Sequence, residues 1–466
     1  MKNKIKIEDI MCVFIILCPI LDIASFIFRN IFNTKISPAT IIRPIIPTIV
    51  ILYLFIKKDE KYKKKLAITG LVYFIYALIH IYIFSKIKTG MSFGTETHEL
   101  QYLINYTFMI INLIIFTTIF KKENIEKLRK SVLIATGIYI VSIYISIITK
   151  TSSHTYIEGM GYKGWFESGN SISAILLLTM FIYLPYVKEK GYRIIVIPIL
   201  IMVGVFLSLL IGTRAGLFGF ILIISLYIII EVIFNILKNK KINKRFLIIG
   251  LISVTTIVLV VIVFGSTTLQ RRKHLKDIES DIIDESSQQN AHITGSILDI
   301  KEQIENDEIQ PGYMSKAQEQ SILDLYNIAN KLKVKNNDQR MQQLIYNLVL
   351  IKNQKNIFLI LFGNGYVANF CELVLEMEFA SMLLNFGIIG FILYMGPFLA
   401  ILFASLYYGV KYRKQIDSKY IFLWFGLAMA FALSLLSGYV FFNLSSATII
   451  ISISTLLFIT NKNLKK

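Results

Sequence analysis

The sequence predicts an all-α fold, a polytopic bundle of about 12 transmembrane helices with a large extracytoplasmic loop containing amphipathic helices. Of its 466 residues, 55% are hydrophobic, and the mean hydropathy is +0.63. This composition is too apolar for a water-soluble protein. The apolar residues form runs of roughly 20, which is the length needed to cross a hydrocarbon core about 30 Å thick. Helices are expected in these runs because lipid offers no hydrogen-bond partner to the backbone.

The predicted spans follow one another along most of the chain, with one long polar interruption. The segments 193–211 and 214–237 are joined only by Gly212 and Thr213. They therefore form either two spans or one re-entrant hairpin, and we count them as two. In chain order the spans cover residues 10–32, 38–56, 66–85, 101–120, 131–149, 171–187, 193–211, 214–237, 246–265, 379–409, 420–440 and 443–461.

Lysine and arginine gather in alternate connectors, such as KKDEKYKKK at 57–65 and KNKKINKR at 238–245. Basic connectors face the cytoplasm, so we expect a multi-pass protein of the bacterial cytoplasmic membrane with both termini inside. The net charge of +19 arises largely from these connectors. They contact anionic membrane lipid, and we expect no nucleic-acid partner.

The polar interruption divides the chain into three parts. We expect spans 1 to 9 in residues 1–265, an extracytoplasmic loop in 266–370 and spans 10 to 12 in 371–466. Two stretches of the loop have helical periodicity and should lie over the outer membrane surface. In the first, which Ser315 should cap, the apolar face comprises Ile322, Leu325, Ala329 and Leu332. In the second it comprises Met341, Leu344, Ile345 and Leu348.

Polar residues within the spans gather toward the outer ends, which predicts a polar cavity open to the outside. Asp22 lies at mid-to-outer depth, and Glu231 is the exception near an inner end. The residues expected near the outer ends are Arg43, Glu99, Asn105, Asn170, Arg214, Glu376, Glu378 and Asn443.

Each of these residues also has a structural interpretation. Arg43 and Glu99 could reach the membrane interface by snorkelling. Asn170 in ESGNSIS is better explained as a helix N-cap than as a substrate ligand. Asp22 could pair with an arginine across the bundle. The acidic run DIESDIIDE at 277–285 is expected to be a solvated face, and we predict no metal site.

Two local patterns stand out. The first is LLIGTRAGLFGFILI, in which Arg214 is flanked by glycines at the head of a long apolar helix. Glycines allow close approach, and an arginine near a helix N-terminus makes a compact anion site. The second is LFGNGYVANFCELVLEMEFASMLLNFGIIGFILY, a glycine-rich turn followed by carboxylates.

Together with GYKGWFESGNSIS and the DQR that precedes the second loop helix, these patterns resemble the O-antigen ligase and polymerase superfamily. The resemblance implies that Arg214 contacts a pyrophosphate and that Arg340 lies over the cavity. The GNGY turn matches the superfamily's Gly-x-Gly segment, which makes Asn364 and Tyr366 further substrate-binding candidates. Arg43, Glu99 and Asn170 complete that set.

One departure concerns the general base. Ligases of this superfamily usually carry a histidine where this chain reads LEMEF, and here Glu376 and Glu378 occupy that place. The polymerase-like branch from Gram-positive bacteria has the same feature. Either glutamate could be the base. In an ideal helix two such residues point about 200° apart, so only one should face the cavity unless the helix starts after Glu376.

The resemblance implies a polymerase that moves glycan from a polyprenyl-diphosphate carrier to a glycan acceptor at the outer face. The transfer would be inverting and metal-independent, with no cofactor. Glu376 or Glu378 would be the base, and Arg214 and Arg340 would bind the diphosphate. The expected partners are the lipid-linked oligosaccharide and a chain-length regulator or other assembly proteins. The alternatives are ligase-type transfer to a terminal acceptor and a flippase or transporter.

The charge pattern generates a topological prediction. A cysteine introduced near residue 320 should react with a membrane-impermeant reagent on intact cells, whereas one near residue 240 should react only after the cells are opened. Labelling of both sites is measured by mass shift on gels. Protection of the site near residue 320 in intact cells would overturn the whole arrangement.

Overall fold

The structure is a computed structural model that describes residues 6–34, 37–90, 92, 94–156, 159–191, 193–238, 255, 266–274, 296–334, 338–366, 373 and 375–465. In these residues the chain is almost entirely helical, and the only strands are the short antiparallel β1 (Ser153–His154) and β2 (Tyr162–Gly164). Nine of the described helices are long and apolar enough to cross a membrane. The predicted class, a polytopic all-α membrane protein, is confirmed.

The long helices coincide closely with the predicted spans. The chain breaks between them where caps are present, as at Ser37, which caps α2 ahead of Pro38 at its first position. The nine are α1 (Ile7–Asn30), α2 (Pro38–Lys57), α3 (Glu60–Ile87), α4 (Glu96–Ile119), α5 (Ile125–Ile148), α6 (Gly169–Lys190), α8 (Arg214–Leu237), α18 (Ser418–Leu436) and α19 (Leu444–Leu464).

Three predicted spans differ from this pattern. The segment 193–211 forms α7 (Arg193–Val205) and a π-helical turn, η1 (Phe206–Leu210), and reverses at Gly212 into α8. The segment 379–409 was predicted as one helix, and that prediction is wrong. It forms α15 (Glu378–Asn385), α16 (Gly387–Tyr394) and α17 (Gly396–Lys411), with a 56° bend between α16 and α17. The predicted span 246–265 lies outside the described residues, except for Thr255.

Gly387 explains the break between α15 and α16. Gly387 has a φ of +70°, and a Cβ there would lie 2.5 Å from the backbone of Gly363 and Leu361. Only glycine fits such a close approach with a positive φ. The helix therefore stops at Asn385 and restarts at Gly387, and the turn that contains Gly363 packs into the break.

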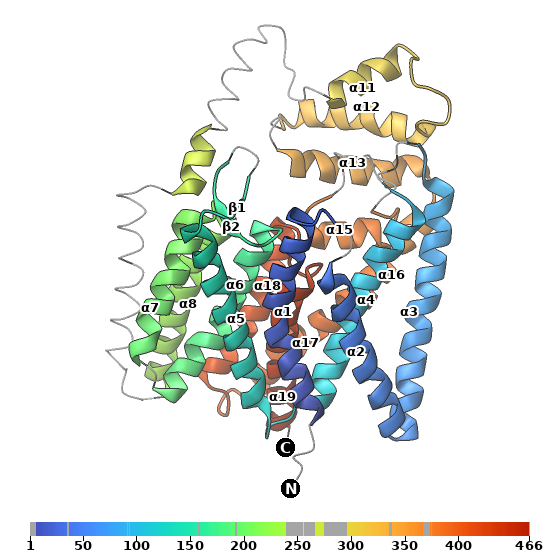
Figure 1. Cartoon of the computed structure of the whole chain (residues 1–466). Helices are drawn as coiled ribbons and strands as arrows, with labels where there is room; N and C mark the ends of the chain where they lie inside the picture. The colour runs from blue at the N-terminus through green and yellow to red at the C-terminus, as the bar shows by residue number, and fades with distance from the viewer. Residues whose placement is uncertain are drawn as a thin grey trace.

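Helices α6 and α19 form the centre of the bundle, since nearly all of their side chains are buried. Helices α2 and α3 lie at the periphery and expose most of their apolar surface. Figure 1 shows the helices running roughly parallel, with both termini at the same end. The inner-end residue Glu231 lies near that end, where it pairs with Lys188 and accepts a hydrogen bond from Ser418 (2.7 Å).

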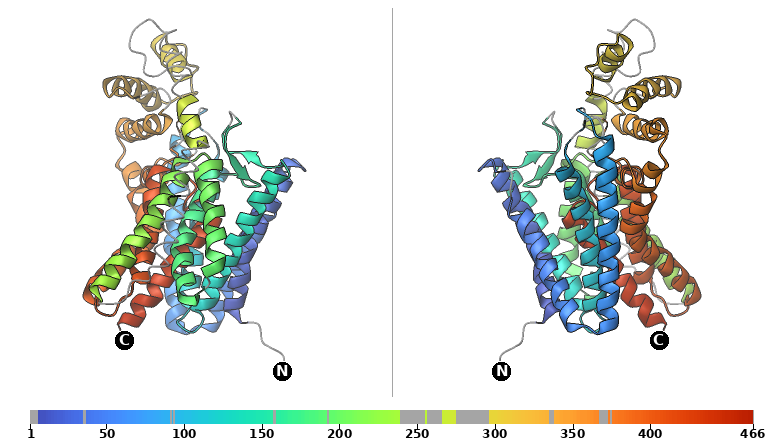
Figure 2. Two further views of the ribbon diagram at one scale, coloured as in Figure 1. Left: turned by 90° about the vertical axis from the view of Figure 1, so that its left-hand side faces the viewer. Right: turned by 90° about the vertical axis from the view of Figure 1, so that its right-hand side faces the viewer.

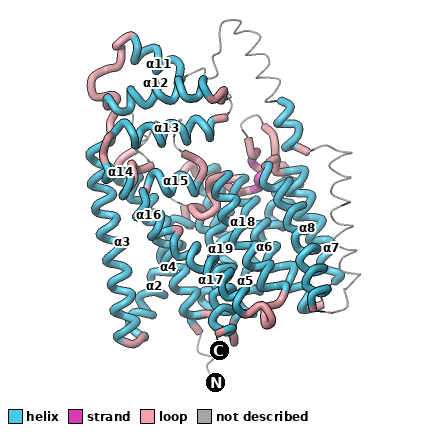
Figure 3. Tube along the Cα trace, turned by 180° about the vertical axis from the view of Figure 1, so that it is seen from behind, coloured by secondary structure: helices cyan, strands magenta, loops and turns pink. Residues whose placement is uncertain are grey.

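The large loop forms a compact layer at the end of the bundle opposite the termini (Figure 2). We call it the outer layer, after the side of the membrane predicted for this loop. It contains α11 (Ser296–Glu305), α12 (Lys316–Lys331), α13 (Gln339–Gln354) and α14 (Ile357–Phe362). Seen from behind, α14 and α15 lie between α13 and the bundle (Figure 3). Helices α11, α12 and α13 bury a small core of their own. The sequence analysis predicted helices that lie separately over the membrane surface, whereas these helices pack on one another.

The predicted faces of the loop helices are correct only in part. Ser315 caps α12 as expected, and Ile322, Leu325 and Ala329 are buried, but Leu332 is exposed. On α13 the buried face is rotated from the predicted one because the helix packs on α12. Ile345 is buried there with Tyr346, Val349 and Leu350, whereas Met341 and Leu348 are exposed.

Candidate functional site

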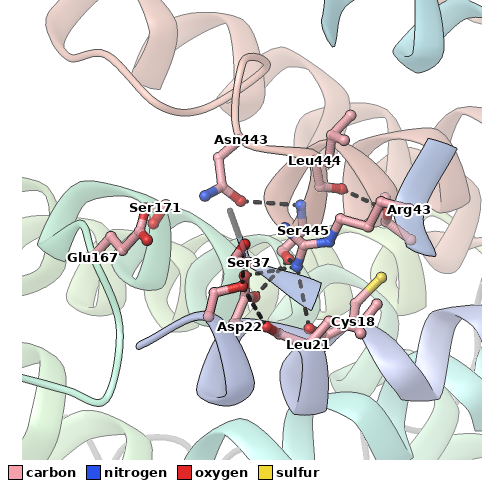
Figure 4. Close-up of polar contacts among 12 residues, drawn as sticks. Cys18, Leu21, Asp22, Ser37, Arg43, Glu167, Ser171, Asn443, Leu444 and Ser445 are labelled. Carbon is pink, nitrogen blue, oxygen red and sulfur yellow. Dashed lines mark hydrogen bonds and ion pairs between the residues drawn. The ribbon is translucent and has the colours of Figure 1, made fainter. Parts of the chain in front are cut away.

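Asp22 on α1 binds side chains from three other helices, and Figure 4 shows its partners Arg43 and Ser445. One of its carboxylate oxygens pairs with Arg43 of α2 at 2.6 Å, and the other accepts hydrogen bonds from Tyr139 of α5 and Ser445 of α19, both at 2.6 Å. The side chains of Arg43 and Asp22 are only 10% and 17% exposed. The prediction that Asp22 pairs with an arginine across the bundle is confirmed.

Arg43 therefore does not snorkel to the interface. Its Nη2 also donates to Ser445 Oγ at 2.7 Å and to the Cys18 carbonyl at 3.2 Å. Its Nε is buried and finds no acceptor among the described residues. Asp22 balances the charge of the guanidinium, so Arg43 first of all holds α1, α2 and α19 together.

Glu99 of α4 is fully buried, so the snorkelling interpretation is wrong for this residue as well. Its carboxylate lies 2.8 Å from His80 Nε2 and accepts the Tyr366 N–H at 2.9 Å. His80 Nδ1 lies 2.6 Å from the Phe362 carbonyl, which can only accept, so Nδ1 carries a proton. One proton then lies between His80 Nε2 and the Glu99 carboxylate, and the hydrogen bond between them is present wherever that proton resides.

The glycine-rich turn that follows α14 packs directly on this pair. Gly363 has a φ of +83°, and a Cβ there would lie 2.0 Å from the Asn385 carbonyl. A Cβ on Gly365, whose φ is +77°, would lie 2.7 Å from Phe84. These contacts explain why the turn needs glycine. The substrate-binding candidates Asn364 and Tyr366 are both buried within this packing.

Glu378, at the start of α15, binds the turn between α18 and α19. Its carboxylate accepts backbone N–H groups from Val440 (3.0 Å) and Phe441 (2.7 Å), and also that of Phe442. Tyr106 donates to it at 3.4 Å. Three consecutive backbone donors fix the conformation of residues 437–443, so Glu378 positions that turn.

Glu376 lies just outside this buried cluster. Its carboxylate is 50% exposed and lies 3.4 Å from Nε of Arg340, at the start of α13. Arg340 also donates to the Leu436 carbonyl at 2.8 Å. Because α15 begins at Glu378, Glu376 precedes the helix and the two glutamates are free to point differently. The structure thus brings together Arg340 and Glu376, which were predicted from distant motifs.

Tyr439 lies on the turn between α18 and α19, which contacts the Glu376 segment. A Cβ on Gly438 would lie only 2.6 Å from the Glu376 carbonyl, so the two segments touch. Partial burial of the Tyr439 phenol raises its pKa, and the carboxylates of Glu376, Glu167 and Glu378 raise it further. Glu167 in turn pairs with Arg29 at 2.5 Å. We call the exposed residues Arg29, Glu167, Arg340, Glu376 and Tyr439 the rim.

Arg214 and Asn170 lie at the heads of α8 and α6. These heads are joined by Thr213, which caps α8 and lies 2.7 Å from Ser173. The predicted cap role of Asn170 is wrong, because Ser168 is the residue that caps α6. Arg214 is exposed and forms no ion pair with any residue that the structure describes. No hydrogen bond or ion pair between described residues joins Arg214 or Asn170 to the rim.

The sequence interpretation missed several residues of this site. His80 is an ionisable residue inside an apolar span, and that alone marks it as a candidate. Tyr139 and Tyr439 carry no comparable signal, since tyrosine is common in this chain. Among the described residues, no group of three or more His, Cys, Asp or Glu side chains is arranged to hold a metal ion, and the acidic run 277–285 lies outside them.

The two glutamates should respond differently to substitution. Glu378→Gln places an amide N–H against backbone N–H groups and should destabilise the folded protein by about 2 kcal/mol. Glu376→Gln, at an exposed position, should change stability by less than about 0.5 kcal/mol. Thermal unfolding of the purified variants in detergent measures both. Equal stability losses would contradict the different roles of the two residues.

A family model described as O-antigen ligase like membrane protein matches residues 3–463. No curated protein matches the chain.

Proposed function

We propose a specific glycan-transfer reaction for this chain, which belongs to the O-antigen ligase-like membrane protein family. The family associates the chain with membrane glycan transfer in general. The proposed reaction is polymerisation: glycan moves from a polyprenyl-diphosphate carrier to the hydroxyl of a glycan acceptor at the outer face of the cytoplasmic membrane. The observation that carries this proposal is the exposed Glu376 carboxylate beside the Arg340 guanidinium at the outer end of the bundle.

In the proposed reaction Glu376 is the general base. The acceptor oxygen attacks the anomeric carbon of the donor sugar while Glu376 takes the hydroxyl proton. The bond between that carbon and the diphosphate oxygen breaks, and the polyprenyl diphosphate leaves with the electron pair. Attack opposite the leaving group inverts the anomeric centre. Glu376 is preferred to Glu378 because the Glu378 carboxylate already accepts three backbone N–H groups.

Arginines are the proposed partners of the leaving diphosphate. Guanidinium groups bind phosphate through paired donors and neutralise its charge without a metal. Arg214 suits this role because it is exposed at a helix head and unpaired among the described residues. Arg340 is the second candidate, and it would exchange its contact with Glu376 for one with the substrate. Arg43 contributes less in this scheme, since Asp22 already balances its charge.

Two observations favour chemistry at the outer face over transport. The exposed ion pair joins Arg340 on α13 of the outer layer to Glu376 just before α15, and both helices lie at the end of the bundle opposite the termini (Figure 1). The polar residues nearer the bundle interior, Asp22 and Glu99, are occupied by their partners. A transporter needs a substrate site near the membrane midplane between two repeats. The proposed partners are the lipid-linked oligosaccharide and an assembly protein that sets chain length.

Deletion of the gene tests the function directly. We expect single repeat units to accumulate on the lipid carrier at the outer leaflet, because translocation continues and polymerisation stops. Gel analysis of surface and lipid-linked glycans, with enzymatic probing of the leaflet, measures this. Repeat units trapped on the inner leaflet would point to a flippase, and full-length chains retained on the carrier would point to a ligase.

Arg214 variants test the diphosphate contact. Arg214→Ala should lower the transfer rate roughly a hundredfold, because a charge-assisted contact made in the transition state contributes about 3 kcal/mol. Arg214→Lys should be nearly as poor, since it loses the planar fork. Expression should stay near normal. Arg413→Ala, which removes an exposed cation at the other end of the bundle, is the control. A near-normal amount of polymer from Arg214→Ala would contradict the proposed contact of Arg214 with the diphosphate.

A further inference from the structure

Tyr439 combines a strained backbone with an exposed aromatic ring. Its φ is +65°, a conformation that side chains other than those of Gly, Asn and Asp rarely adopt. The other described non-glycine residues with positive φ are Asn, Asp or Lys, so Tyr439 is the only aromatic among them. Its side chain nevertheless remains 49% exposed at the rim. Strain held at an exposed functional group is typical of binding sites.

The surrounding contacts fix this strained conformation. Ser446 Oγ, which is buried, donates to the carbonyls of Tyr439 (3.2 Å) and Val440 (2.6 Å). On the other side, Glu378 accepts the N–H groups of the three residues that follow Tyr439. Gly438 has no room for a side chain against Glu376. The turn is therefore held in one conformation, and in that conformation the Tyr439 ring is exposed to solvent.

Beneath Tyr439 a series of stacked rings continues into the bundle. The ring of Tyr439 meets that of Phe442 edge-on at 6.2 Å, and Phe442 stacks on Tyr102 at 5.1 Å. Tyr102 stacks on Tyr366 at 4.5 Å with nearly parallel planes. These rings support Tyr439 from below. The Tyr439 hydroxyl makes no hydrogen bond to any described residue.

The rim contains two ion pairs, Arg340 with Glu376 and Arg29 with Glu167, and the two carboxylates act electrostatically on the Tyr439 phenol. A sugar ring has an apolar face of C–H groups and a margin of hydroxyls. An aromatic ring offers the matching apolar surface, while carboxylates and guanidinium groups bind hydroxyls. We propose that Tyr439 is the floor of a glycan-binding subsite in which a sugar of the acceptor chain stacks on its ring.

The acceptor is chosen over the donor because of the neighbouring base. Glu376, which takes the acceptor's proton in the proposed function, lies against the Tyr439 turn. A sugar stacked on Tyr439 would therefore bring its hydroxyl toward that carboxylate. This inference rests on the proposed function, and it makes Tyr439 a specificity-determining residue. The chemical class of the ligand is a neutral or hydroxyl-rich oligosaccharide.

Substitution by glycine separates the ring from the strain. Tyr439→Gly relieves the positive φ and should fold with an equal or higher melting temperature. Its affinity for the delipidated repeat oligosaccharide from the same bacterium should be about tenfold weaker, because the stacking surface is gone. Tyr439→Phe keeps the ring and should bind within about threefold of the parent. Binding is measured on the full chain in nanodiscs, together with KM for acceptor.

Tyr439→Gly changes both the backbone strain and the aromatic ring, and one control variant tests each of these two changes. Asn33→Gly relieves a positive φ (51°) on the outer side without removing a ring. Tyr313→Ala removes a ring that is 45% exposed in the outer layer. Neither should alter oligosaccharide binding. Should Tyr439→Gly not fold, Tyr439→Asn provides the same comparison, since asparagine also adopts positive φ.

Parent-like binding by folded Tyr439→Gly or Tyr439→Asn would overturn the subsite, as would equal weakening by Tyr313→Ala. If the gene deletion leaves polymerisation intact, the proposed function fails. Loss of oligosaccharide binding on removal of the Tyr439 ring would then still report a glycan subsite. The failures of the two proposals are thus distinguishable.

Discussion

The contacts of the Asp22 carboxylate with Arg43, Tyr139 and Ser445 hold together the end of the bundle that carries the site. A charge inside a membrane protein is costly unless it is paired and hydrogen-bonded, and Asp22 satisfies both conditions with partners from α2, α5 and α19. Because Ser445 lies within the first turn of α19, the same contact fixes where that helix starts. The turn before α19 is thereby anchored at one end.

The other end of that turn is anchored by Glu378, which is connected to Glu99 through hydrogen bonds of Tyr106 and Tyr366. Residues 437–443 thereby link the two polar clusters of the site. One cluster is centred on Asp22 and the other on the buried pair of His80 and Glu99. The carboxylates of both clusters have partners, and the clusters serve mainly to position the backbone. The groups left exposed, including Glu376 and Arg340, lie above them at the rim. A rigid polar base thus supports an accessible site, which is the arrangement that transfer of a glycan between two large substrates requires.

The fold was largely predictable because apolar runs and basic connectors act locally. The predicted span 214–237 has the same bounds as α8, since Thr213 caps the helix and an apolar run follows. The site was less predictable because its contacts join distant segments. That Glu378 binds a turn after α18 depends on how α15 packs against α18, which no local pattern encodes. The break at Gly387 likewise depends on the turn at Gly363.

In the proposed function, the rim supports formation of a glycosidic bond as a lipid diphosphate is released. The most direct measurement uses the purified full chain in liposomes with lipid-linked repeat units extracted from the deletion strain. The account predicts glycans of increasing length on the carrier, with one polyprenyl diphosphate released for each new linkage. Repeat units that cross the bilayer at unchanged length, with no diphosphate released, would contradict it.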